Sequence, residues 1–205
     1  MNEQDAAVFN KAGYSDAVST VEMEEAAAFR RKEFVDHWES LSFDQRSSLK
    51  FYQSEWYEPI NGYLRDGSEI KDEVIKKDIA ALDSTMTHPM SQDTVVYRGM
   101  QQDVSGLEVG DEYSDKAFVS TTLAYSTADA FATKDYNANE VMCEILVPKG
   151  ARCTVTVDPA GASGEHEILL PRDSKFKVVG KEKLPRETDS GDKYEMDYLY
   201  LEMLP

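Results

Sequence analysis

The sequence predicts an α+β fold in a single domain, with helices in its first half and strands in its second. Residues 19–87 carry apolar side chains at helical spacing. Residues 93–204 carry short apolar runs, alternating or continuous, that are broken by Gly, Pro and Asp, as is typical of strands. The chain has 205 residues, of which 41% are hydrophobic, and this is enough to fill a core. We therefore expect one domain over residues 19–205, mainly helical to residue 87, preceded by a flexible segment over residues 1–18.

Capping signals divide the first half into three expected helices. Residues 19–22 form a capping box, and a helix of about 18 residues should follow it. Ser42 with Gln45 repeats the signal for a second helix, which runs into residues 51–52. Ser68 precedes a third helix. The apolar residues that we expect to face the core are Ala27, Ala28, Phe34, Val35 and Trp38 in the first helix and Ile70, Val74, Ile75, Ile79 and Leu82 in the third.

The second half predicts strands around one short helix. The run at residues 94–97 is apolar and β-branched, and Arg98 and Gly99 close it. Ser126 with Asp129 is expected to cap the short helix that carries Ala130 and Phe131. A Pro-Lys-Gly turn suggests that the strands on either side of it form a hairpin. The other expected strands lie at 118–122, 141–147, 151–157, 168–170, 175–179 and 194–204, with the turn at 148–150.

The composition excludes several classes of partner. With 22 basic against 39 acidic residues, the formal net charge is −17, which opposes binding to nucleic acid or anionic lipid, because Lys and Arg bind both. A protein partner with a basic surface fits this charge better. No apolar run approaches about 18 residues, and the first five residues lack the basic and apolar regions of a signal peptide, so we expect a soluble protein without membrane insertion. Cys143 and Cys153 lie in apolar segments without a CxxC pair, which indicates buried thiols and no metal.

Two carboxylates stand where a loop of small residues enters a strand. Residues 161–164 are followed by Glu165, His166 and Glu167 and then by an apolar run. Alternate residues of a strand face one side, so Glu165 and Glu167 are expected to project together, about 6.6 Å apart along the chain, with His166 on the other side. Like charges at this separation raise each other's pKa and need donors or cations. The segment is therefore either a solvated edge strand or a functional carboxylate pair.

Other polar residues could complement these carboxylates. Arg98, at the end of its strand, presents a fork of donors suited to phosphate oxygens. Ser120, Thr121 and Thr122 end another strand with hydroxyls that could orient a carboxylate or a ribose. Taken alone, each of them is also an ordinary surface or strand-end residue. The hypothesis of a binding site therefore depends on their order along the chain.

That order resembles the Arg, Ser-Thr-Ser, Glu-x-Glu pattern of ADP-ribosyltransferase exotoxins and effectors. Residues 60–65 are similar to the helix that these enzymes place over NAD, and residues 145–150 to their central hairpin. The resemblance spans roughly residues 50–180. It implies an ADP-ribosyltransferase-like fold, with two small packed β-sheets that form an NAD cleft and an N-terminal helical region. It also implies a mono-ADP-ribosyltransferase that needs NAD and no metal and modifies a protein in a host-cell cytoplasm, as a phage-encoded enzyme or a secreted effector.

Residue roles follow from the same resemblance. Arg98 would bind the pyrophosphate and nicotinamide ribose, and the Gly99 backbone would hold the carboxamide. Ser120 would orient Glu167, which would engage the ribose 2′-hydroxyl and stabilise the cationic sugar. Glu165 would receive the guanidinium of an arginine on the target protein. The other residues expected to contact NAD are Asn61, Arg65, Thr122 and Phe131.

The chain departs from the family's pattern at three positions, and three alternatives stay open. Thr122 replaces the second Ser, Ala162 stands where many relatives carry an aromatic used in target recognition, and Lys134 lies near an Arg of some relatives. Glu165, where others have Gln, is typical of relatives that modify arginine. The alternatives are an NAD glycohydrolase, which would also use Glu167, a catalytically silent NAD- or protein-binding module, and a carboxylate-pair glycosidase. The last usually binds sugar through exposed tryptophans, whereas the tryptophans here lie in the helical half.

Overall fold

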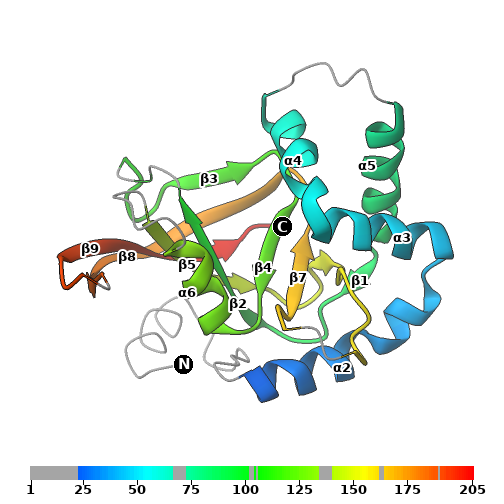
Figure 1. The fold of residues 1–205 in the computed structure, drawn as a ribbon, viewed down its shortest axis with the longest axis horizontal. Helices are drawn as coiled ribbons and strands as arrows, with labels where there is room; N and C mark the ends of the chain where they lie inside the picture. The colour runs from blue at the N-terminus through cyan, green and yellow to red at the C-terminus, as the bar shows by residue number, and fades with distance from the viewer. Residues whose placement is uncertain are drawn as a thin grey trace.

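Helices form the first half of the chain and gather at one end of the sheet, as Figure 1 shows. The computed structural model describes residues 23–66, 73–101, 104, 106–133, 140–161, 164–188 and 190–205. The helices of the first half are α2 (Met23–Ser40), α3 (Phe43–Phe51), the π-helical turn η1 (Tyr52–Trp56), α4 (Tyr57–Asp66) and α5 (Glu73–Thr85). The 18 residues of α2 agree with the predicted length. The expected capping box at residues 19–22 and the segment 1–18 lie outside the described residues.

The start of α3 is confirmed at the level of single hydrogen bonds. The Gln45 backbone N donates to Ser42 Oγ at 3.2 Å, and the Ser42 backbone N donates to Gln45 Oε1 at 2.8 Å. This reciprocal pairing is the predicted capping box. The helix does not end at residues 51–52, because η1 continues it into α4.

The buried faces of α2 and α5 differ from the predicted apolar stripes. Ala28 is exposed, Ala27 and Val35 are half-buried, and Val74 of α5 is 61% exposed. The predicted faces rest on apolar residues alone. The helix α2 also buries the guanidinium of Arg30 and the imidazole of His37, both of which are hydrogen-bonded. The buried residues are Ala26, Arg30, Phe34, His37 and Trp38 in α2 and Ile75, Ile79, Leu82 and Thr85 in α5. Ser68 and Ile70 lie outside the described residues.

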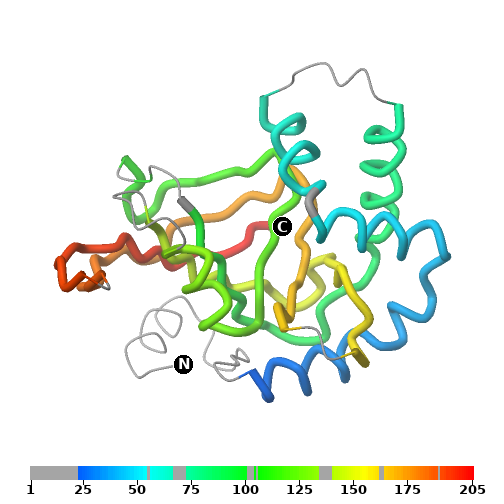
Figure 2. Tube along the Cα trace, in the orientation of Figure 1, coloured from blue at the N-terminus to red at the C-terminus, as the bar shows by residue number. Residues whose placement is uncertain are grey.

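The second half forms two sheets, which confirms the α+β class. The larger sheet has seven strands in the order β3-β8-β9-β5-β2-β4-β7, and the smaller pairs β1 with β6. The C-terminal strand β9 lies inside the larger sheet, parallel to β5 and antiparallel to β8 (Figure 2). The elements are β1 (His88–Pro89), β2 (Thr94–Gln101), β3 (Glu112–Asp115), β4 (Val119–Thr122), α6 (Tyr125–Ala132), β5 (Glu140–Val147), β6 (Arg152–Cys153), β7 (Glu167–Leu170), β8 (Ser174–Glu187) and β9 (Lys193–Met203).

The predicted hairpin of residues 141–147 and 151–157 is wrong. The turn between them exists, with Gly150 at φ 87° and Ala151 N donating to Pro148 O at 3.0 Å. The chain then leaves β5, because β6 pairs with β1 and Thr154 forms a bridge with Leu169 of β7. The turn chemistry is local and could be predicted, whereas the strand that follows selects a distant partner.

Three smaller corrections concern β2, α6 and two short strands. β2 does not end at Arg98, since Arg98 and Gly99 still pair with β5. Ser126 does not cap α6, because the helix begins at Tyr125 and Ala124 is the N-cap residue, without a side-chain hydrogen bond. The short strands β1 and β3 were not predicted. The buried, free thiols of Cys143 and Cys153 are as expected.

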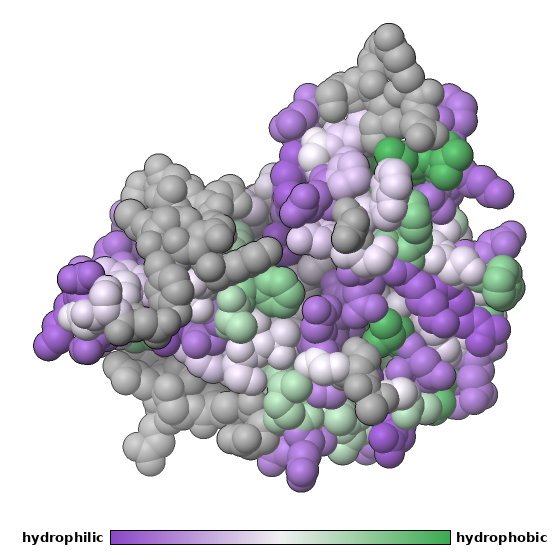
Figure 3. Space-filling view, in the orientation of Figure 1, coloured by the Kyte–Doolittle hydropathy of each residue, from purple (hydrophilic) through white to green (hydrophobic). Residues whose placement is uncertain are grey.

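Apolar side chains fill both faces of the central strands. On one face the helices α2–α5 pack against Val96, Ile145 and Leu169, and on the other α6 packs against Val95 and Met142. The face of the molecule in Figure 3 is mostly hydrophilic, with hydrophobic residues in small separate patches. Among the described residues, no helix is both long and apolar enough to cross a bilayer. The packing leaves one end of β2, β4 and β7 open toward η1 and α4, where the pocket lies.

Candidate active site

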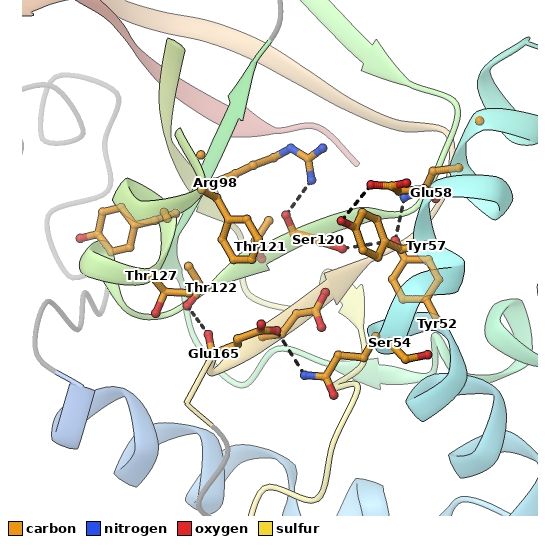
Figure 4. A pocket seen from close by; sticks show the side chains of 18 of the residues that line it. Tyr52, Ser54, Tyr57, Glu58, Arg98, Ser120, Thr121, Thr122, Thr127 and Glu165 are labelled. Carbon is orange, nitrogen blue, oxygen red and sulfur yellow. Dashed lines mark hydrogen bonds between the residues drawn. The ribbon is translucent and has the colours of Figure 1, made fainter. Parts of the chain in front are cut away.

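A pocket of about 510 Å³ opens between the ends of β2, β4 and β7, the helical segment η1–α4, and α6. Its size is within the range of about 300–1,000 Å³ that is common for small-molecule sites. Figure 4 shows side chains from the sheet and from the helical segment converging on this space. All the predicted site residues line it: Asn61, Arg65, Arg98, Gly99, Ser120, Thr122, Phe131, Glu165 and Glu167.

The two carboxylates reach the pocket from different backbone settings. Glu167 begins β7 and is 7% exposed, whereas Glu165 precedes the strand in a turn and is exposed. Between them His166 adopts φ 46°, a left-handed conformation that is uncommon outside glycine. The predicted strand alternation therefore does not extend to Glu165. The left-handed residue lets both carboxylates line the pocket while His166 is buried away from it.

Glu167 is held by hydroxyl groups. Thr156 Oγ1 donates to Glu167 Oε2 at 2.5 Å. Burial raises the pKa of Glu167, hydrogen bonds from Thr156 and Ser120 oppose this, and the charge of Glu165 raises the pKa further. Two hydroxyl donors and the nearby charge of Arg98 favour the ionised form of Glu167, and so oppose the effect of burial on its pKa.

Arg98 connects β2 to β4 beneath the pocket. Its Nη1 donates to the backbone O of Ser120 at 2.7 Å (Figure 4). The guanidinium also lowers the pKa of Glu167. The positive charge of Arg98 therefore stabilises the buried carboxylate, and the same charge suits an anionic ligand in the pocket.

A tyrosine from the π-helical turn adds a second layer to this network. The Tyr52 and Ser120 hydroxyls are hydrogen-bonded at 3.2 Å, and Asn61 Nδ2 donates to Tyr52 Oη at 2.9 Å. Burial, followed by the charge of Glu167, raises the pKa of Tyr52 to about 12, so the phenol stays protonated. The Oδ1 of Asn61 is buried and has no hydrogen-bond partner among the described residues. A polar ligand in the pocket could satisfy this oxygen.

Glu165 is positioned through its backbone as well as its side chain. Thr122 Oγ1 donates to Glu165 O at 2.6 Å and accepts from Ala124 N at 3.0 Å. Gln53 Nε2 donates to Glu165 Oε2 at 3.3 Å. Thr122, predicted to contact NAD, thus also holds the turn that carries Glu165.

The remaining predicted residues come from α4, β2 and α6. Arg65 forms a bidentate ion pair with Asp115, at 3.0 Å and 2.8 Å, and this hydrogen bonding raises the pKa of Arg65. Gly99 has no room for a side chain, because a Cβ would collide with the Ala128 carbonyl and the Ala132 amide of α6. Phe131 of α6 is 47% exposed. Lys134 and Ala162 lie outside the described residues.

Several residues that complete the site were not predicted from the sequence. Tyr52, Gln53, Tyr57 and Glu58 line the pocket from η1 and α4, and Thr156 supports Glu167 from beneath. The run Tyr52-Gln53-Ser54 continues a predicted helix, and no local signal marks its π-helical turn, although such turns are frequent at functional sites. Thr156 was assigned to a hairpin that does not form.

The fold and this pocket define the ADP-ribosyltransferase class: an arginine in a central strand, a serine beside a buried glutamate, and a second glutamate two residues earlier. The chain belongs to the ADP-ribosyltransferase exoenzyme family, since the family model with that description matches residues 26–201. This confirms the resemblance stated from the motifs. Enzymes of this class take their ADP-ribose from NAD.

Known proteins agree with the assignment. The chain is 26% identical over 167 residues to the mono(ADP-ribosyl)transferase SpvB of Salmonella typhimurium, a match that covers 65% of this chain and 26% of SpvB. The chain therefore spans about a quarter of the length of that relative.

Two solved toxin structures are similar in fold. Plx2a of Paenibacillus larvae has a TM-score of 0.72 and 20% identity, over 90% of this chain and 98% of its own. The BECa toxin of C. perfringens, determined with NADH, has a TM-score of 0.78 and 16% identity, over 92% of this chain and 50% of its own.

The residues present fit a nicotinamide dinucleotide. The guanidinium of Arg98 suits phosphate, and the unpartnered Asn61 Oδ1 can accept a hydrogen bond from the ligand. The carboxylate of Glu167 lines the same pocket, and a carboxylate is the group that stabilises a cationic sugar. Among the described residues, no group of three or more His, Cys, Asp or Glu side chains is arranged to bind a metal ion.

Proposed function

We propose that this protein transfers ADP-ribose from NAD to an arginine side chain of a target protein, with Glu167 and Glu165 in separate roles. The observation that carries the proposal is the contrast within the pair. One carboxylate is buried and hydrogen-bonded beside Arg98, and the other is exposed at the pocket mouth, two residues away.

The buried half of the pocket suits cleavage of the glycosidic bond. As the bond between nicotinamide and ribose breaks, positive charge develops on the sugar, and Glu167 stabilises it. Ser120 and Thr156 hold the Glu167 carboxylate without reorganisation during the reaction. Arg98 binds the pyrophosphate and the nicotinamide ribose, and the Gly99 backbone binds the carboxamide. Asn61, Arg65, Thr122 and Phe131 complete the NAD contacts.

The exposed half suits the acceptor. An arginine guanidinium is a poor nucleophile while fully protonated, because its pKa is above about 12. Glu165 accepts a proton from the guanidinium as a guanidinium nitrogen bonds to the ribose C1′, and nicotinamide leaves with the electron pair of the broken bond. The formal charge of −17 favours a target with a basic surface. In this proposal the enzyme acts on a host protein in the host cytoplasm.

Product mapping tests the proposal. The protein is incubated with NAD and either agmatine or a host-cell lysate, and modified residues are located by mass spectrometry. ADP-ribose on agmatine and on protein arginines is expected, with transfer to protein falling as salt is added. Nicotinamide release without any modified arginine would contradict transfer and favour NAD hydrolysis, and labelling confined to cysteine or asparagine would contradict the acceptor assignment.

A further inference from the structure

Arg30 of α2 is a buried guanidinium that the proposed reaction does not use. Its residue exposure is 0%, although α2 lies at the edge of the molecule. A buried arginine is costly unless polar groups surround it. Figures 1 and 2 show α2 running beside the segment that leads into β7, and the partners of Arg30 come from that segment.

The first partner is the turn at residues 158–161. Arg30 Nη2 donates to the backbone O of Gly161 at 3.2 Å. The turn is also closed by its own bonds, since Ala160 N donates to Asp158 Oδ1 at 2.8 Å and Gly161 N donates to Asp158 O at 3.0 Å. Burial lowers the pKa of Arg30, and the negative charge of Asp158 opposes this effect. Arg30 is thus tied to the turn by a hydrogen bond and by charge.

A second residue near Arg30, His166, lies at the other end of the same loop. His166 is 5% exposed, and after burial the positive charge of Arg30 is the next cause that lowers its pKa. The His166 backbone is fixed to the sheet, because Leu123 N donates to His166 O at 3.2 Å. Arg30 therefore lies near His166, which the sheet holds, while its hydrogen bond is made to the turn at residues 158–161.

We propose that Arg30 is a positioning residue, which fixes the turn at residues 158–161 and so aims the Glu165 carboxylate at the incoming arginine. The inference rests on the proposed function, because it assigns Glu165 to the acceptor. Glu167 is held separately by Thr156 and Ser120, so loss of Arg30 should leave cleavage of NAD largely intact. A displacement of Glu165 by about 1 Å can cost up to roughly 100-fold in transfer.

The test compares Arg30→Met with Arg31→Met, which removes the same charge from an exposed position one residue along α2. Nicotinamide release without acceptor, ADP-ribose transfer to agmatine and amide hydrogen exchange over residues 158–166 are measured for each. Arg30→Met should lower the ratio of transfer to hydrolysis by roughly tenfold or more. It should also speed amide exchange in the loop, and Arg31→Met should change neither. If Arg30→Met does not fold, Asp158→Asn replaces it, because Asn keeps the hydrogen bond to Ala160 and removes the charge that faces Arg30.

The possible outcomes decide the inference separately from the proposed function. If Arg30→Met loses hydrolysis and transfer equally, so that the ratio of transfer to hydrolysis is unchanged, the positioning role is overturned. Unchanged exchange over 158–166 overturns the anchoring of the loop, whatever the activities. A wild-type protein that releases nicotinamide but modifies no agmatine or protein arginine contradicts the proposed function and with it the acceptor role of Arg30. In that case faster loop exchange in Arg30→Met still supports the anchor.

Discussion

Glu167 and Glu165 are two residues apart, yet the regions that hold them differ in burial, hydrogen bonding and backbone. Glu167 is 7% exposed, begins β7 and is hydrogen-bonded by Thr156 and Ser120. Glu165 is exposed, precedes the left-handed His166 and is reached by the side chain of Gln53. One pocket thus contains a buried, hydrogen-bonded carboxylate, a setting suited to stabilising developing charge, beside an exposed carboxylate.

The largest expected effect is loss of the buried carboxylate. Glu167→Gln keeps the shape and removes the negative charge, so nicotinamide release and transfer should both fall by about 10²–10⁴-fold. Both activities are measured by product chromatography, with Glu195→Gln, an exposed change on β9, as the control. If either activity survives in Glu167→Gln, the buried region is not where bond cleavage is stabilised.

Removal of the cation beside Glu167 should have a smaller effect. Arg98→Met should weaken NAD binding by about 1.5–3 kcal/mol, because a charge-assisted phosphate contact is lost. Calorimetry without added metal measures the affinity, and Arg152→Met removes a charge from an exposed position on β6. Equal affinities for Arg98→Met and wild type would exclude a direct phosphate contact.

The hydrogen bond from Thr156 should act on pH dependence more than on the maximal rate. Burial raises the pKa of Glu167 and the Thr156 hydroxyl lowers it, so Thr156→Val should raise it further. The reactive carboxylate is then lost at a higher pH, and the acid limb of the kcat/KM profile should move upward. Thr127→Val removes a hydroxyl from the same pocket and should leave this limb unchanged. A downward move would contradict the assigned hydrogen bond.

The smallest effect at neutral pH is expected behind the buried region. His37 Nε2 is hydrogen-bonded to Thr154 Oγ1 at 3.0 Å, two residues before Thr156. Burial, followed by the charge of His88, lowers the pKa of His37 to about 4. Because this folded-state pKa is below the unfolded value of about 6.5, the stabilisation is complete above about pH 6.5. It is lost as pH falls toward 4, by on the order of 1–3 kcal/mol.

Urea unfolding of wild type and His37→Gln at pH 7 and pH 4.5 measures how much the neutral His37 contributes to stability. The loss of stability on acidification should be smaller in His37→Gln. Glu167, whose pKa is raised, contributes in the opposite direction in both proteins, so the difference between them isolates His37. Identical pH dependence in the two proteins would show that His37 is not a buried neutral imidazole.

Features with local causes could be predicted from the sequence. The capping box of Ser42 and Gln45 lies within one helical turn, and α3 starts there. The order of Arg98, Ser120 and Glu167 along the chain predicts that they share one site, and all three line one pocket. The signal is the resemblance of this order to the family's pattern, which the family model confirms over residues 26–201.

Features set by distant partners could not be predicted. The turn at residues 148–150 was read correctly, but β6 pairs with β1, which moves Thr156 beneath Glu167. The buried face of α2 contains Arg30 and His37, which are hydrogen-bonded to Gly161 and Thr154, more than 100 residues away in sequence. Left-handed His166 also has no local sequence signal, so both glutamates were assigned to the pocket for the wrong geometric reason.

The comparison of the two carboxylates is tested most directly by Glu165→Gln, assayed for nicotinamide release and for transfer to agmatine. Glu58→Gln is the matched control, because Glu58 is another exposed carboxylate that lines the pocket. We predict that Glu165→Gln loses transfer by about 10²-fold or more, because it lacks the general base, while hydrolysis stays within about tenfold of wild type. Loss of hydrolysis as complete as the loss of transfer would contradict the separation of cleavage from acceptor activation.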